Sequence, residues 1–178
     1  MPDTSSAARS LRQPVHTVYG GAHLFAPDTT AKLGAIALKA LREHAPNAGT
    51  LASAIGVEAS LASRVYPRVV AKLERDAVED FRIDFEDGFG VRRDAEEDDV
   101  AKRTAVHVAD GMTAGTLPRG IGIRIKNLGD EMKRRSLRTL ELFLSTLAER
   151  TGGALPENFV ITLPKITSPE QVTHLTEA

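Results

Sequence analysis

Two short segments alternate strictly between apolar and other side chains. Residues 81–86 read Phe-Arg-Ile-Asp-Phe-Glu, and residues 121–126 read Ile-Gly-Ile-Arg-Ile-Lys. This period of two predicts β-strands with one apolar face and one polar face. In an open sheet covered by helices on both sides, parallel strands are apolar throughout. Strands that are apolar outward and polar inward are typical of a (β/α)8 barrel whose lumen holds an active site.

Two further runs predict strands, and helical patterns follow each of the four. Residues 15–19 and 159–163 are rich in β-branched and aromatic side chains. Apolar residues at helical spacing predict helices between 29 and 46, within 50–79, from 94 to 112, from 130 to 152 and from 169 onward. The order β-α-α-β-α-β-α-β-α favours parallel strands joined by crossover helices.

Several details of these helices are specific enough to be tested. Asp94-Ala-Glu-Glu97 resembles a capping box, and Asp130 can cap the next helix, which Gly152 ends. Pro67 is expected to begin or kink a helical segment. One helix face within 50–79 is apolar and consists of Leu61, Val65, Val69 and Leu73.

The length of 178 residues predicts one domain. Residues 1–14 are predicted to be a flexible tail, because this Ser/Ala/Arg-rich start lacks the apolar block of a secretory signal. A transit peptide is the alternative. Residues 15–178 are predicted to be a partial barrel domain of four βα units. A complete barrel needs about 250 residues, so we expect the N-terminal half of a barrel or a sheet completed by association.

Composition excludes several classes of function. The chain has no cysteine, so disulfides, thiolate nucleophiles and cysteine zinc sites are absent. The formal net charge is −1, so the composition does not indicate the basic surface that binds nucleic acid or an anionic membrane. No apolar run is long enough to span a bilayer. The expected location is the cytoplasm.

Acidic side chains follow the strand at 81–86. Asp84, Glu86 and Asp87 stand at its carboxyl end, where the active sites of parallel α/β proteins lie. They can support a metal, act as a base or hold an arginine. The alternative is a structural ion pair or a solvated turn.

Basic side chains follow the next two strands. Arg124 can grip a substrate carboxylate with two parallel hydrogen bonds, as Lys126 beside it cannot. Lys165 follows the strand at 159–163, and His23 lies in the loop after the first strand. All four are candidate substrate-binding residues. The alternatives are an ion pair from Arg124 to Glu86 or Asp87 and solvated lysines.

Four blocks together resemble the citrate-lyase β-subunit/HpcH-HpaI aldolase family of the phosphoenolpyruvate/pyruvate barrel superfamily. They occur in the family's order, between residues 15 and 175. The blocks are Leu24-Phe-Ala-Pro27, Phe85-Glu-Asp-Gly-Phe89, Ile123-Arg-Ile-Lys-Asn127 and Leu163-Pro-Lys165 with Ser168-Pro-Glu-Gln-Val172. The stretch from Tyr19 to Phe25 is most similar to an aldolase-like branch sometimes labelled phosphoenolpyruvate kinase.

The resemblance implies a Mg²⁺-dependent carbon–carbon lyase or aldolase that acts through an enolate on a 2-oxo acid, an acyl-CoA ester or a related carboxylate. Arg124 would hold the substrate, and Glu86 and Asp87 would support the metal indirectly or orient Arg124. The family's direct metal ligands come from the fifth and sixth strands, beyond the four predicted here. Lys126 departs from the family's arginine-asparagine block.

Two other functions stay open at this point. One is a non-catalytic module that binds a carboxylate or associates with itself, because the edges of the first and fourth strands are expected to be unpaired. The other is phosphoryl transfer from phosphoenolpyruvate. A homo-oligomer is expected, with a small carboxylate as ligand and neither nucleic acid nor membrane as partner.

Overall fold

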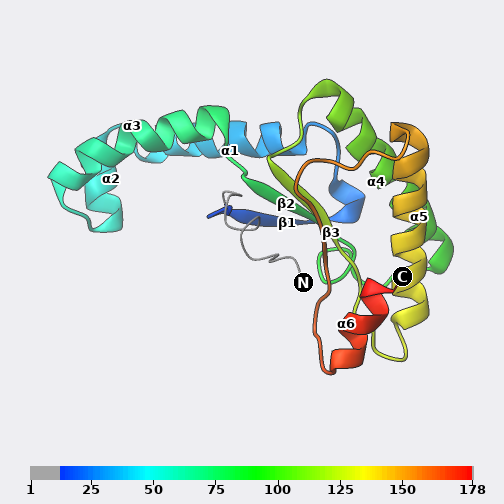
Figure 1. Cartoon of the computed structure of the whole chain (residues 1–178). Coiled ribbons are helices and arrows are strands. Elements are labelled where there is room, and N and C mark those ends of the chain that lie inside the picture. The colour runs from blue at the N-terminus through cyan, green and yellow to red at the C-terminus, as the bar shows by residue number, and fades with distance from the viewer. Residues whose placement is uncertain (1–12, 178) are drawn as a thin grey trace, which may run out of the picture.

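The computed structural model describes residues 13–177 and shows a four-stranded parallel sheet with helices (Figure 1). Residues 1–12 of the predicted tail lie outside the described residues. The elements in chain order are β1 (Thr17–Gly21), η1 (Ala22–Leu24), α1 (Thr29–His44), α2 (Ala48–Ile55), α3 (Ala59–Arg75), β2 (Asp80–Asp84), α4 (Asp94–Ala114), β3 (Gly120–Arg124), α5 (Lys133–Thr151), β4 (Phe159–Thr162) and α6 (Pro169–Thr176).

The sheet has the strand order β1-β2-β3-β4, and every neighbouring pair is parallel. Each connection is therefore a crossover that contains at least one helix. This confirms the α/β class and the four parallel strands. Within the described residues β1 and β4 are the edges of the sheet.

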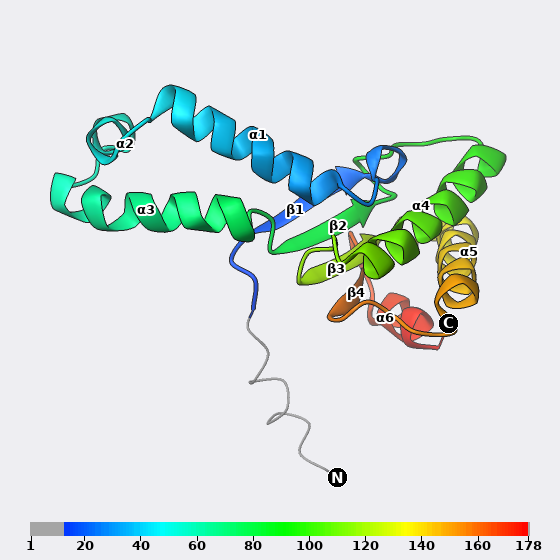
Figure 2. The same cartoon turned by 90° about the horizontal axis from the view of Figure 1, so that it is seen from above.

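The main core lies between the apolar face of the strands and the two long helices α4 and α5. Ile83 of β2 and Ile121 and Ile123 of β3 are fully buried, as is Phe143 of α5. Figure 2 shows α4 and α5 side by side at one side of the sheet. Each such side chain contributes about 1.5–3 kcal/mol by leaving water, so this face fixes the helices on the sheet.

The opposite face of the strands carries polar side chains and glycines. Asp80 and Arg82 form an ion pair at 2.7 Å, and both are largely buried. Gly122 pairs with Arg82 in the register of β2 and β3. A Cβ atom on Gly122 would lie 2.0 Å from the Val160 carbonyl oxygen and 2.6 Å from Nη1 of Arg82. The absence of a side chain there lets the arginine lie across β3.

The helices α1, α2 and α3 form an arm, residues 29–75, that leads away from the sheet (Figures 1 and 2). The side chain of Asn47 accepts a hydrogen bond from the Thr50 amide at 2.9 Å and caps α2. Gly56 ends α2 in the left-handed conformation. Helix α3 runs through Pro67 from Ala59 to Arg75, so the expected start at this proline is wrong.

Two predicted helix caps are also wrong. Arg93, in extended conformation, precedes α4, and Glu97 is buried inside the protein instead of reaching back to the helix start. Helix α5 begins after a turn in which the amides of Met132 and Lys133 both donate to the Gly129 carbonyl, so Asp130 does not cap it. The predicted end of α5 at Gly152, in left-handed conformation, is confirmed.

Within residues 13–177, the structure contains no helix of the length and apolarity that a bilayer crossing requires.

We expect Gly122→Ala to destabilise the protein, because the new Cβ would overlap the backbone of β4. Forced overpacking of this kind costs about 1–3 kcal/mol. Urea unfolding followed by circular dichroism measures the loss. Gly49→Ala is the control, because its Cβ would meet nothing closer than 3.3 Å. Equal stability of the two variants would contradict the close approach of β3 and β4.

Asp98 joins α4 to α5 and predicts a pH dependence of stability. Hydrogen bonds from Arg138 and then Arg135 lower the pKa of Asp98 below its ordinary 3.8 and outweigh the opposing effect of burial. The stabilisation is therefore complete above pH 3.8 and is lost as the pH falls through the lower folded pKa. We expect Asp98→Asn to be less stable near neutral pH and to lose less stability on acidification. Urea midpoints at several pH values test this, with the exposed Asp99→Asn as control.

Candidate functional site

The predicted site residues lie at the carboxyl ends of the strands. Asp84 ends β2 and Arg124 ends β3, and the two are partners in the strand register. Glu86 and Asp87 follow β2 directly, and Lys165 follows β4 after a short connection. We call these five residues the Arg124 cluster.

Arg124 is the centre of this cluster. Its guanidinium contacts three carboxylates, with Nη1 3.2 Å from Asp84 Oδ2, and Nη2 2.6 Å from Glu86 Oε2 and 3.2 Å from Asp87 Oδ2. The guanidinium also lies 5.6 Å from the centroid of the Tyr19 ring. Burial alone would lower the pKa of Arg124, but the three carboxylates outweigh it and raise the pKa. The side chain is 18% exposed, so one part of it faces solvent.

Asp84 shapes the loop that carries the other two acids. Its Oδ1 accepts a hydrogen bond from the Glu86 amide at 2.8 Å, and its Oδ2 accepts one from the Gly88 amide at 3.0 Å. These bonds turn the chain after β2, which is why the strand ends at Asp84 although the alternation in sequence continues to Glu86. The same carboxylate forms an ion pair with Arg124. The Asp84 side chain therefore fixes both the path of the loop and the position of the arginine.

Lys165 reaches the cluster from β4. Its ammonium contacts Glu86, and it lies 2.9 Å from Asp87 Oδ1. Hydrogen bonds to Glu86 and then Asp87 raise the pKa of Lys165, and the bond from Lys165 is the main cause that lowers the pKa of Asp87. The backbone of Lys165 has φ 51°, in the left-handed region. Non-glycine residues in this region are uncommon and gather at functional sites.

His23 lies beside the Arg124 cluster. It belongs to η1, is half-buried, and packs on Phe89 with ring centroids 5.6 Å apart. Its Nδ1 is buried and has no hydrogen-bond partner among the described residues. The ring also approaches Gly21, where a Cβ atom would lie 2.8 Å from its Cε1. His23 therefore lies between the end of β1 and the loop that follows β2.

Lys126 lies apart from the cluster, against helix α4. Its ammonium donates to Glu97 Oε2 at 2.7 Å and to the Phe85 carbonyl at 2.6 Å. Glu97 is completely buried and also accepts a hydrogen bond from the Thr139 hydroxyl at 2.6 Å. The structure thus places Lys126 in a closed polar network between α4, α5 and the end of β3. Its side chain is only 6% exposed, which leaves little of it to meet a ligand.

The cluster does not by itself form a metal centre. Among residues 13–177 no group of three acidic or histidine side chains is arranged to hold a metal ion. Glu86 and Asp87 both receive hydrogen bonds from Lys165 or ion pairs from Arg124. The three carboxylates exceed the two cations by one charge, so a residual negative charge remains at the carboxyl ends of the strands.

The sequence indicated all five cluster residues, although it placed Asp84 in the acidic run without a role of its own. The strand pattern contained a signal for it, because Asp84 shares the polar face with Glu86. Glu97 was assigned to a helix cap, and nothing local in the sequence indicates that its carboxylate meets Lys126, 29 residues away.

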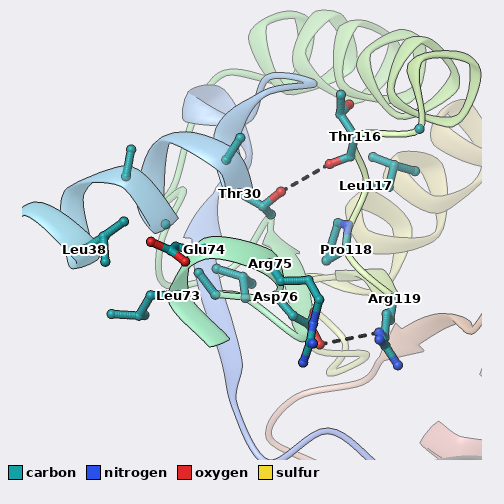
Figure 3. Close-up of a pocket in the computed structure, with 16 residues that line it drawn as sticks. Thr30, Leu38, Leu73, Glu74, Arg75, Asp76, Thr116, Leu117, Pro118 and Arg119 are labelled. Carbon is teal, nitrogen blue, oxygen red and sulfur yellow. Dashed lines mark hydrogen bonds and ion pairs between the residues drawn. The ribbon is translucent and has the colours of Figure 1, made fainter. Parts of the chain in front are cut away.

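A hollow of about 530 Å³ lies at the other end of the strands, where the arm joins the sheet (Figure 3). Residues of α1, the end of α3 and the loop between α4 and β3 line it. Asp76 and Arg119 form an ion pair there at 3.4 Å, and the Thr30 hydroxyl donates to the Thr116 carbonyl at 3.3 Å. Catalytic sites of parallel α/β proteins lie at the opposite, carboxyl end, so the Arg124 cluster remains the candidate site.

We expect Lys126→Met to cost about 3–5 kcal/mol, because it leaves the carboxylate of Glu97 buried without its main cation. Urea unfolding measures this loss. The exposed Lys102→Met on α4 is the control and should change stability by less than about 0.5 kcal/mol. A similar small loss for both variants would show that Glu97 and Lys126 are not a buried pair in solution.

Comparison with known proteins places this chain in a family. Searches of curated proteins and of solved structures found no match. A family model with the description "Domain of unknown function (DUF6986)" matches residues 5–178. The chain therefore belongs to the DUF6986 family.

Proposed function

We propose that this chain forms part of the active site of a carbon–carbon lyase or aldolase-like enzyme that acts on a 2-oxo acid, an acyl-CoA ester or a related carboxylate. The observation that carries the proposal is the placement of Arg124 at the carboxyl end of β3, held by carboxylates and partly open to solvent. The four sequence blocks similar to the citrate-lyase β-subunit/HpcH-HpaI family support the same reaction class.

The three acidic partners of Arg124 differ in exposure, and this suggests how a ligand enters. The side chains of Asp84 and Glu86 are only 4% and 8% exposed, whereas that of Asp87 is 61% exposed. A substrate carboxylate can replace Asp87 on the guanidinium while the two buried acids keep it oriented. Arginine suits this task because its planar fork binds a carboxylate with two hydrogen bonds.

Lys165 supplies a second positive charge at the same edge of the sheet. Its ammonium is on the solvent side of Glu86, with the side chain 55% exposed. In the proposed enzyme, Arg124 neutralises the substrate carboxylate and Lys165 stabilises negative charge that develops on a neighbouring oxygen. The left-handed backbone of Lys165 supports a functional position, because such strain is retained where the surroundings require it.

Mg²⁺ is the ion that the family resemblance implies. It prefers oxygen ligands and keeps several waters, but the described carboxylates are already bonded to Arg124 and Lys165. These residues therefore do not fit a direct Mg²⁺ site. Glu86 and Asp87 have the proposed role of orienting Arg124.

The barrel architecture is part of this proposal. Polar side chains and glycines occupy the sheet face opposite α4 and α5, as on the inner wall of a barrel. The four strands would be one half of that barrel. In this arrangement the Arg124 cluster stands at the barrel mouth, where catalytic residues gather.

A non-catalytic carboxylate-binding module is the second candidate. It is favoured by the ion pairing within the cluster, which leaves none of the three carboxylates without a cationic partner. Binding without turnover separates this candidate from the enzyme.

We expect pyruvate or oxaloacetate to bind saturably in isothermal titration calorimetry with Mg²⁺ present. Arg124→Lys should weaken binding at least about tenfold, because a charged hydrogen bond contributes about 1.5–3 kcal/mol. Arg119→Ala is the matched control, since this arginine precedes the same strand at its other end and is 60% exposed. Unchanged binding in Arg124→Lys would refute the proposed role of Arg124.

A second measurement addresses the reaction. Cleavage of oxaloacetate or of a 4-hydroxy-2-oxo acid, followed as pyruvate release, should fall with Arg124→Lys and persist with Arg119→Ala. Saturable binding with no cleavage of any of these acids would favour the non-catalytic module.

A further inference from the structure

The arm has no large buried side chain. Among residues 29–75, those that are buried are Gly34, Ala45, Ala52 and Ala62. The larger apolar side chains of the arm therefore all stay at least partly open to water. A helical unit of this length is normally stabilised by packing an apolar face against something else.

Part of that apolar surface is well exposed. Ile36 is 65% exposed on α1, and Ile55 is 60% exposed at the end of α2. On α3, Leu61 and Val65 are 44% and 36% exposed and lie four residues apart, on one face of the helix. The first two residues of the apolar face predicted for α3 are therefore exposed and are not packed in a core. Exposed apolar surface of this kind marks sites of protein association.

The charge of the arm is opposite to that of the rest of the described chain. The arm has seven basic residues against three acidic ones. The body, residues 13–28 and 76–177, has 14 Lys and Arg against 20 Asp and Glu. Arg64 and Arg68 flank the exposed Leu61 and Val65 on α3. A surface complementary to the arm therefore has an apolar centre with acidic residues around it.

We propose that the arm docks on the body of a second copy of this chain. Helices α1 and α3 lead away from the sheet (Figure 2), so the tip of the arm is directed away from its own body. The acidic body of another copy has the complementary charge, and such complementarity speeds and orients association. The contact joins two different surfaces, arm to body, and is independent of the function proposed for the Arg124 cluster.

The first test is the oligomeric state of the protein by analytical ultracentrifugation over a range of concentrations. We expect a dimer or larger assembly that weakens as ionic strength rises. Combined Ile55→Asp and Leu61→Asp substitutions should raise the dissociation constant at least about tenfold, equivalent to about 1.4 kcal/mol. The combined Ser53→Asp and Ser60→Asp substitutions, at exposed residues of α2 and α3, are the control, because they add the same charge without removing apolar surface and should weaken association less. Circular dichroism should show unchanged helix content in both variants.

A monomeric wild type, or an assembly that the arm variant leaves intact, would overturn the proposal. The second test maps the contact. Because the chain has no cysteine, Ile55→Cys carries a single photo-crosslinker at the arm tip. Crosslinks between copies should reach residues 76–177. Crosslinks between two arms, or binding to anionic phospholipid vesicles by a protein that stays monomeric, would contradict docking on the body.

Discussion

The parallel register between β2 and β3 is the constraint on which the rest of the structure depends. It places Asp84 beside Arg124 on one face and aligns Ile83 with Ile123 on the other. The second alignment buries an apolar surface beneath α4 and α5, whose hydrophobic contribution holds the sheet in place. The pairing of Asp84 with Arg124 brings a carboxylate and a guanidinium together where both strands end. A shift of one residue would exchange these faces and destroy core and cluster together.

Two ion-pair networks stand near the ends of these strands, and their burial gives them different chemical roles. Lys126 and Glu97 are both almost completely enclosed, and Glu97 is also bonded to Thr139. Such a network specifies how α4 and α5 pack and leaves little of either side chain exposed to a ligand. Arg124 and Lys165 instead meet solvent on one side, with Asp87 as an exposed partner that a ligand can replace. Arg124 and Lys126, which are two residues apart in sequence, thus serve different purposes because they belong to networks of different depth.

The arm differs from the main core, because its helices are specified locally while its apolar residues remain exposed. Its helices form from local signals, such as the Asn47 cap and Gly56, and its only buried residues are one glycine and three alanines. Apolar residues that periodicity alone would assign to a core, Leu61 and Val65, are exposed because no other described element covers them. Local sequence therefore specified the helices of the arm without specifying the surface they pack against.

The sequence by itself determined the α/β class, the four strands and most of the cluster, because periodicity and position at a strand end are local properties. Glu86, Asp87, Arg124 and Lys165 could be predicted to meet, since the carboxyl ends of neighbouring parallel strands lie at one edge of a sheet. Only the tertiary structure decided that Glu97 pairs with Lys126 and that Asp84 turns the chain after β2. Those choices depend on which side chains are enclosed together, and burial of a charge is stabilised only by a partner that folding brings from elsewhere in the chain.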